Sequence, residues 1–354
     1  MDIRLEDVWD DYGLDGLQEN LDKLFPEYNL SLNKILEGLI GGDMLGTVEY
    51  VFKGTVGVFL EQIAGLKELL MMLLLLGIAA TVLTHFVEIF DRHQIADLAY
   101  YFMYLLFMMV LFRCFEQTGE IVAQVLTDIV LFIKLLIPTY LLAVGVVTGI
   151  STAGAYSQLF ALVVYGTECL LSGWIYNMIS VYTMLTMVNG IWMEEKLKLL
   201  IGLVHRIIVV ALKGALGIVT GISIFQNLIT PVLDTAQNTL LHKVVTAIPG
   251  VGDLSGGVMQ LVLGSAVVIK NSIGVMLLLL MIMLCLGPLL KIAAIGWVLR
   301  LAAALLGMVS DKRLVQCTNQ MGEGCMLMFR LVGTAMLLFV ILISLIATGT
   351  NHMI

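Results

Sequence analysis

A run of thirty-three consecutive residues, 135–167, carries no formal charge. An apolar helix of about 20 residues crosses the roughly 30 Å hydrocarbon core of a membrane, where a helix satisfies its own backbone hydrogen bonds. Hydrophobic residues make up 60% of the chain and charged residues only 13%, whereas soluble domains hold about 25% charged residues. This pattern excludes a soluble enzyme, a disordered protein, a disulfide scaffold and a basic nucleic-acid binder. It predicts an all-α fold, a polytopic transmembrane helical bundle.

Other mainly apolar runs follow one another along the chain, and together they predict about eight transmembrane spans. The runs are 69–87, 98–112, 135–167, 169–193, 214–233, 254–269 with 271–290, 289–308 and 331–347. The longest of them must turn back near its polar interruption at 151–154. Seven spans remain if Pro288 kinks one long helix instead of separating two.

The distribution of Lys and Arg near the span ends predicts the orientation. Lys312, Arg313 and Arg330 flank the last span on its N-terminal side, whereas residues 348–354 carry no formal charge with His neutral. We therefore expect the C-terminus to be extracytoplasmic. An even number of spans places the N-terminus on the same side and the turn at 92–93 inside.

The acidic residues gather at the start of the chain. Residues 1–49 hold twelve Asp and Glu against three Lys and Arg, while the rest of the chain carries a net charge of +1. Leucines at helical spacing between 14 and 24, and again over 30–40, predict two amphipathic helices there. Residues 46–66 predict a helix in the membrane interface. We therefore divide the chain into an acidic amphipathic N-terminal segment, 1–66, extracytoplasmic or interfacial, and a transmembrane bundle, 67–354.

A short sequence recurs within the predicted bundle. Residues 145–151 and 217–223 share six of seven residues, and both copies contain GxxxG, a pattern that lets helix backbones approach closely. One hypothesis is a parallel internal repeat, as in some transporters. The alternative is chance in a chain rich in Gly, Val, Ile and Thr.

Ionisable side chains within the predicted spans call for a structural or functional explanation, because inserting each of them into the membrane costs about 2.5–3.5 kcal/mol on insertion scales. The candidates are Asp128, Lys134, Glu168, His205, Arg206, Lys213, Lys270, Lys291 and Arg300. Lys134 either satisfies the backbone carbonyl that Pro138 leaves free or pairs with Asp128. Glu168 either lines a water-filled path or sits at a turn. Snorkelling toward the membrane surface is our interpretation of the candidates near span ends: Lys213, Lys291 and Arg300.

The sequence shows no motif for a metal site, a cofactor site or a catalytic site. His205 has no second His or carboxylate at i+3 or i+4, and the five cysteines match no zinc spacing. We expect the cysteines to act as small hydrophobes. No nucleotide-binding, esterase or zinc-protease motif occurs. We therefore expect no cofactor, no metal and no enzyme activity.

The second half of the chain carries an ordered series of motifs. They are Ile248-Pro249-Gly-Val-Gly252-Asp253, then Lys270-Asn271-Ser-Ile-Gly274, Pro288-Leu-Leu-Lys291-Ile292, Leu301-Ala-Ala-Ala-Leu305 and Asp311-Lys-Arg. This series resembles the stage III sporulation protein AE family of endospore-forming bacteria. By this resemblance the candidate site residues are Pro249, Gly252, Lys270, Asn271, Gly274, Pro288 and Lys291.

The resemblance implies a polytopic protein of the mother-cell membrane around the forespore. Members of that family belong to the channel, or feeding tube, that links the two cells and supports forespore development. The implied partners are the other stage III A-operon products, among them a secretion-type ATPase, ring-forming proteins and small membrane proteins, and the forespore stage II protein Q. Within that complex the chain is expected to act as a conduit or as an assembly platform.

Two further hypotheses stay open, an independent small-molecule permease and a non-conducting scaffold. A permease predicts that Lys134, Glu168, Arg206 or Lys270 converge on one polar cavity near mid-membrane. A scaffold predicts a dry interior and an exposed apolar or small-residue face for partner helices.

Overall fold

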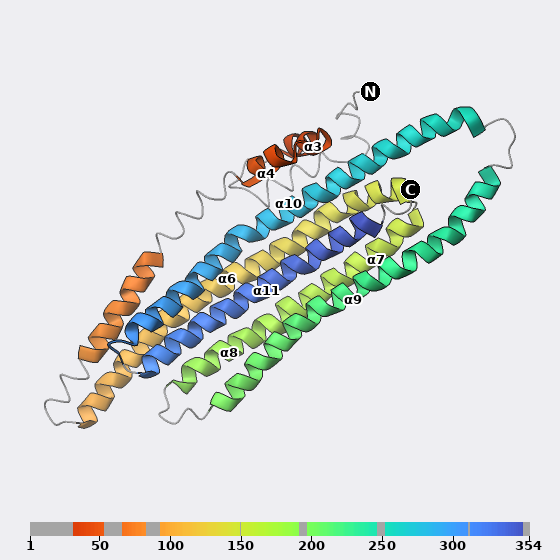
Figure 1. The fold of residues 1–354 in the computed structure, drawn as a ribbon. Coiled ribbons are helices and arrows are strands. Elements are labelled where there is room, and N and C mark those ends of the chain that lie inside the picture. Colours follow the sequence, from red (N-terminus) through yellow and green to blue (C-terminus); the bar gives the residue numbers. More distant parts are fainter. Residues whose placement is uncertain are drawn as a thin grey trace.

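The computed structural model describes residues 31–52, 66–82, 93–148, 150–190, 197–245, 252–310 and 312–349, and all regular elements in these ranges are helices. The named helices are α3 (Leu32–Ile40), α4 (Met44–Phe52), α6 (His93–Thr148), α7 (Ile150–Gly166), the π-helix η1 (Thr167–Ile175), α8 (Tyr176–Asn189), α9 (Lys198–Val245), α10 (Gly252–Leu306) and α11 (Lys312–Gly349). Residues 66–82 form a further helix. The long helices lie side by side in an elongated bundle (Figure 1). The predicted all-α bundle is confirmed.

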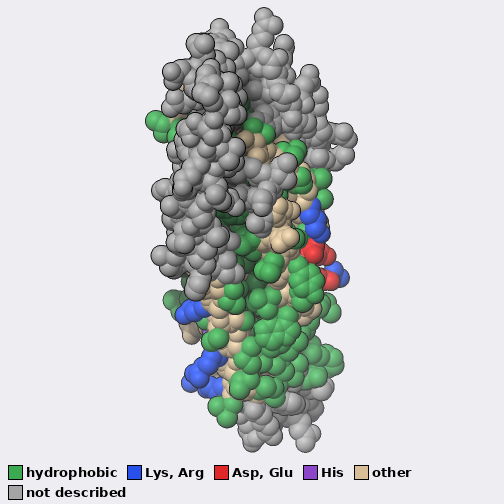
Figure 2. All heavy atoms as spheres, turned by 90° about the vertical axis from the view of Figure 1, so that its right-hand side faces the viewer, with side chains coloured by type: hydrophobic (Ala, Val, Ile, Leu, Met, Phe, Trp, Pro, Cys, Tyr) green, Lys and Arg blue, Asp and Glu red, His purple; other side chains and the backbone are tan. Residues whose placement is uncertain are grey.

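In the described residues, five helices are long and apolar enough to cross a membrane. They are Tyr101–Val147, Tyr156–Asn189, Lys198–Gly221, Val267–Leu306 and Lys312–Ala347. Hydrophobic side chains also cover much of the described surface of the bundle (Figure 2). Helices that are apolar on all sides are typical of a membrane bundle, because lipid rather than water surrounds them.

The count of five differs from the predicted eight because runs predicted as separate spans are joined into continuous helices, and because the helix of the run 69–87 is described only over residues 66–82. Helix α6 contains the run 98–112 and the start of 135–167, and α10 contains all the runs between 254 and 306. A helix continues through the polar residues between two apolar runs as long as its backbone hydrogen bonds continue. Pro288 lies inside α10, so the alternative of one long helix at this proline is correct. At 55 residues, α10 is about 80 Å long.

The predicted reversal near 151–154 is present a few residues earlier. Helix α6 ends at Thr148, and α7 begins at Ile150 and packs back on α6. A Cβ atom on Gly145 would lie 3.4 Å from the Cβ of Ala153, so a glycine suits the close approach of the two helices. The second copy of the repeated sequence, 217–223, lies inside α9. The two copies therefore have different local structures, although α6 and α9 run in the same direction (Figure 1).

The helix predicted over 30–40 is confirmed as α3, which packs against α10. The chain leaves it through Gly42, whose φ of 82° favours glycine. Asp43 then caps α4, because the Gly46 N–H donates to the Asp43 carboxylate at 3.0 Å. The helix predicted before Pro26 and the segment 53–65 lie outside the described residues, and the boundary at residue 66 stays a prediction.

The core is apolar and continuous along α6, α10 and α11. Four of the five cysteines are buried, and only Cys169 is exposed, so the prediction that they act as small hydrophobes is confirmed for those four. The helix at 66–82 packs beside the turn between α10 and α11, where the Ser310 hydroxyl donates to the Gly77 carbonyl at 3.0 Å.

Candidate functional site

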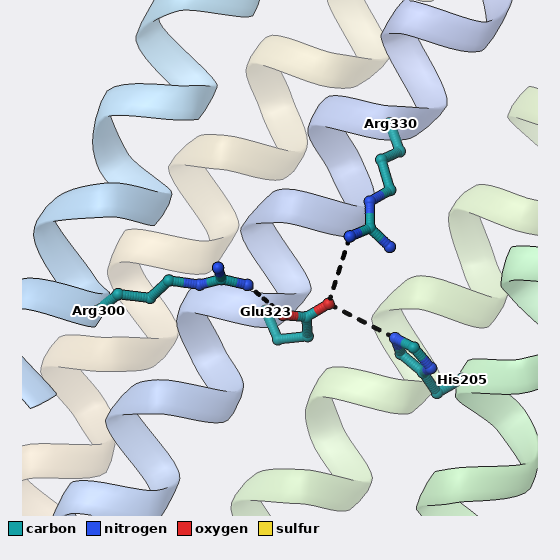
Figure 3. A network of polar contacts seen from close by, with 4 residues as sticks. All are labelled: His205, Arg300, Glu323 and Arg330. Carbon is teal, nitrogen blue, oxygen red and sulfur yellow. Dashed lines mark hydrogen bonds and ion pairs between the residues drawn. The ribbon is translucent and has the colours of Figure 1, made fainter.

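Four charged side chains from three helices meet on one side of α11 (Figure 3). They are His205 of α9, Arg300 of α10, and Glu323 and Arg330 of α11, and we name them the charged junction. The Arg300 guanidinium donates a hydrogen bond to Glu323 Oε2. His205 Nε2 lies 3.5 Å from Glu323 Oε1, and Arg330 Nη2 lies 3.9 Å from the same oxygen. One carboxylate thus ties three helices together.

A close crossing of α10 and α11 brings Arg300 to Glu323. A Cβ atom on Gly322 would lie 3.2 Å from the carbonyl oxygen of Gly296 and 3.0 Å from Arg300 Cγ. A Cβ atom on Gly296 would in turn lie 3.5 Å from the Gly322 carbonyl oxygen. Two glycines facing each other let the helix backbones approach to a distance that side chains prevent.

A third glycine, Gly324, lies on the opposite side of α11. A Cβ atom on Gly324 would lie 2.7 Å from the hydroxyl of Thr183 on α8 and 3.6 Å from the ring of Phe115 on α6. Glu323 therefore stands between two glycines that each fit against a neighbouring helix. This packing holds α11 in the rotation that turns the Glu323 carboxylate toward α9 and α10.

The imidazole of His205 packs against Tyr182 of α8, with ring centroids 5.7 Å apart and an interplanar angle of 49°. Tyr182 is buried, so it forms a fixed apolar wall behind the imidazole. The position of His205 thus depends on the packing of α8 against α9.

The charged junction is half-buried and carries excess positive charge. The exposed fractions of the side chains are 26% for Glu323, 35% for Arg300 and His205, and 47% for Arg330. Two guanidinium groups face one carboxylate, so the formal charge is +1 even with the imidazole neutral. The contacts of His205 and Arg330 are longer than the usual 2.7–3.2 Å of an N–H···O hydrogen bond. Arg300 Nε is buried without a hydrogen-bond partner in the described part of the chain.

Sequence reasoning missed Glu323, the centre of this arrangement. Residues 331–347 form the last uncharged run, which assigned Glu323 and Arg330 to the flank of a span. In the structure α11 continues through both residues, and the candidate span is Lys312–Ala347. The available signal was Gly322-Glu323-Gly324, an acid between two small residues in an otherwise apolar stretch. For Arg300, the snorkelling interpretation is wrong, because its guanidinium pairs with Glu323.

Lys134 and Glu168 form an ion pair of their own, with Lys134 Nζ 2.7 Å from Glu168 Oε1. The suggested pairing of Lys134 with Asp128 is wrong, since Gln124 donates to Asp128 instead. Glu168 does not sit at a turn, because η1 joins α7 and α8 into one rod. The side chains of the pair are 55% and 45% exposed, so the pair lies on the outside of the bundle. Pro138 lies inside α6 without ending it.

One motif residue of α10, Gly274, lies against a tyrosine of α6, Tyr140. Lys270 is completely buried, and a Cβ atom on Gly274 would lie 3.1 Å from the hydroxyl of Tyr140. The Tyr140 hydroxyl and Asn271 Oδ1 are buried, and neither has a hydrogen-bond partner among the described residues. The Lys270-Asn271-x-x-Gly274 turn is therefore a packing contact with α6.

The other predicted site residues lie apart from the charged junction. Arg206 is exposed on α9, and Pro288 and Lys291 are half-buried on α10. Gly252 is the first residue of α10, and Pro249 lies outside the described residues.

The polar residues proposed for a permease do not line one cavity. Lys270 lies in the interior of the bundle, whereas Lys134, Glu168 and Arg206 are on its outside. In the described part of the chain, no group of three or more His, Cys, Asp and Glu side chains is arranged to hold a metal ion.

The long apolar helices and the charged junction between them define a polytopic helical membrane protein. The chain belongs to the stage III sporulation protein AE family, whose model matches residues 30–350. It is similar to the stage III sporulation protein AE of Bacillus subtilis (strain 168), with 20% identity over 343 residues that cover 95% of this chain and 86% of that protein. No solved structure matches the chain. The family expected from the motif series is thereby confirmed, and with it a role in sporulation.

Proposed function

We propose that this protein is a multi-spanning membrane component of the channel, or feeding-tube, complex between mother cell and forespore, and that it acts there as an assembly platform. The observation that carries the proposal is the family match over residues 30–350. The proposed location is the mother-cell membrane around the forespore. The proposed partners are the secretion-type ATPase, the ring-forming proteins and the small membrane proteins of the same operon, with stage II protein Q on the forespore side. The proposed role is not enzymatic.

The apolar interior favours a platform over a conduit. Large side chains fill the middle of the bundle, among them the fully buried Phe132, Tyr140, Met276, Leu280 and Phe339. A polar solute or a peptide would have to displace this packed core, which is as dense as an organic crystal in proteins generally. The same observation weighs against an independent permease.

The outer surface of α9 suits contact with partner helices. Cβ atoms on Gly214, Gly217 and Gly221 would each meet nothing within 4 Å among the described residues. Val210 and Ile218 beside them are 63% and 64% exposed. Small residues on a lipid-facing helix let a second helix approach closely, and association in membranes depends on such packing.

The charge distribution supports extracytoplasmic termini. Lys198, Lys312 and Arg313 lie at one end of the bundle, the end opposite to the C-terminus of α11 (Figure 1). Basic residues mark the cytoplasmic side. The helix at 66–82 and the five candidate spans make six passes along the bundle, an even number that leaves α3 and the end of α11 on the same side.

The platform role is tested by site-directed cross-linking in sporulating cells of the native host. Ile218→Cys on α9 is expected to cross-link to a product of the same operon, whereas Leu131→Cys, similarly apolar and exposed on α6, serves as the matched control. The purified chain in liposomes is expected to pass no small fluorescent solute. Solute flux through the chain alone, or identical cross-links from both positions, contradicts the platform role.

A further inference from the structure

The charged junction interrupts a surface that is otherwise apolar. On α10, Trp297 precedes Arg300 by one helical turn and is 66% exposed. On α11, Leu337 follows Arg330 by two turns and is 43% exposed. A Cβ atom on Gly333, between those two residues, would meet nothing within 4 Å among the described residues. Half-exposed charges bordered by exposed apolar side chains require a partner that is itself both charged and apolar.

The hydrogen-bond donors of the charged junction outnumber its acceptors. Each guanidinium carries five N–H donors, and a carboxylate accepts at only two oxygens. Of the three basic side chains, only Arg300 makes a hydrogen bond to Glu323, while His205 and Arg330 remain at 3.5 and 3.9 Å. Glu323 thus positions these side chains without accepting hydrogen bonds from all of their donors. The remaining donors match an oxyanion, and Arg in particular binds phosphate with two parallel hydrogen bonds.

The charged junction lies toward the basic end of the bundle, with Glu323 eleven and Arg330 eighteen residues after Lys312 at the start of α11. Arg300 lies six residues before Leu306 at the end of α10, about 9 Å along the helix axis. His205 lies seven residues after Lys198 at the start of α9, about 10 Å along its axis. Both helix ends lie at the basic end of the bundle (Figure 1). Basic ends face the cytoplasmic leaflet, where anionic lipids concentrate.

We propose that the charged junction binds the phosphate of an anionic membrane lipid. The phosphate oxygens accept hydrogen bonds from Arg330 and Arg300 and face the imidazole of His205, and the acyl chains lie along the apolar surface near Leu337 and Trp297. Glu323 holds the guanidinium groups apart and oriented. A bound lipid of this kind would link α9, α10 and α11 through a group that the chain does not supply.

The test uses the full chain purified in a neutral detergent, with lipid retention measured by native mass spectrometry. Phosphatidylglycerol is expected to be retained about tenfold more than phosphatidylcholine, because both carry a phosphate diester but the net positive charge of the junction repels the choline cation. Arg330→Gln is expected to lower phosphatidylglycerol affinity about tenfold, the effect of losing one charge-assisted contact. Arg113→Gln, which removes an exposed arginine of α6, is expected to change it less than about twofold.

Three results overturn the proposal. Equal retention of the two lipids by the wild-type chain excludes anion recognition, and this comparison needs no variant to fold. Displacement of phosphatidylglycerol by an equal concentration of inorganic phosphate assigns the site to a free phosphate instead of a lipid. Equal losses in Arg330→Gln and Arg113→Gln attribute binding to overall charge. Size-exclusion profiles of both variants in the same detergent verify that each is folded.

Discussion

The glycine crossing at the charged junction makes Gly322→Ala an informative substitution. An alanine Cβ would lie 3.0 Å from Arg300 Cγ, 3.2 Å from the Gly296 carbonyl oxygen and 3.4 Å from the Arg300 nitrogen. Two of these three atoms belong to the backbone of α10, so the strain is not relieved by rotating a side chain. Helix α10 must move away from α11, and the Arg300 to Glu323 hydrogen bond must lengthen.

The expected change in the free energy of unfolding follows from two destabilising contributions and one stabilising contribution. Overpacking in a filled interior costs about 1–3 kcal/mol, and weakening a hydrogen bond between charged groups costs up to about 1.5–3 kcal/mol. Alanine gains about 1 kcal/mol over glycine in a helix interior. We expect Gly322→Ala to lower the free energy of unfolding by about 1–3 kcal/mol, since only part of each cost is incurred when the helices relax.

Gly333→Ala on the same helix is the matched control. Its Cβ would meet nothing within 4 Å among the described residues, so this variant is expected to gain about 0.5–1 kcal/mol from helix propensity alone. The assay is thermal unfolding of both variants in one detergent, followed by circular dichroism. A midpoint of Gly322→Ala equal to or above that of Gly333→Ala refutes the close crossing of α10 and α11.

Three further substitutions test other contacts. Glu323→Gln is expected to lower the free energy of unfolding by about 1–3 kcal/mol, because it leaves the half-buried guanidinium groups without their counter-ion; a thermal midpoint unchanged from wild type contradicts this role. The Lys134→Gln and Glu168→Gln double-mutant cycle is expected to give a coupling energy of about 1–3 kcal/mol, because the pair lies in candidate membrane spans, where lipid rather than water surrounds it; a coupling of only a few tenths of a kcal/mol would indicate that water screens the pair. Gly274→Ala is expected to be destabilising by about 1–3 kcal/mol because its Cβ meets the Tyr140 hydroxyl, and Tyr140→Phe, which removes that unpartnered oxygen, is expected to restore part of the loss; the absence of rescue in unfolding measurements would place the conflict elsewhere.

The predictable part of the fold rests on local properties of the chain. The apolar runs led to the all-α membrane bundle, and the leucine pattern with Gly41-Gly42 led to the end of α3 at Ile40. The motif series of the second half led to the family. The number of helices was less predictable, because a proline such as Pro288 between two apolar runs marks a helix end only if the chain turns there. In the structure, α10 continues through Pro288 and packs against α6 and α11.

The sequence predicted single residues of the candidate site but not the contacts between them. Arg300 and His205 were recognised as charges that need a reason, but their partner Glu323 was assigned to a flank. Glu168 and Lys134 were both recognised, but their pairing was not predicted. Charge pairs between helices depend on the rotation and depth of each helix, and neither quantity is encoded in the spacing of residues within one helix.

The sequence alone determined that this protein is a helical membrane protein of the stage III sporulation protein AE family, because apolar length and motif order are properties of the chain itself. The tertiary structure decided which charges meet. Gly296 and Gly322 permit α10 and α11 to approach closely, and Gly324 permits α11 to approach α6 and α8, so that Glu323 reaches Arg300, His205 and Arg330. The contact of His205 with Glu323 joins residues 118 positions apart and that of Arg300 with Glu323 joins two different helices, so only the packing of the helices specifies them.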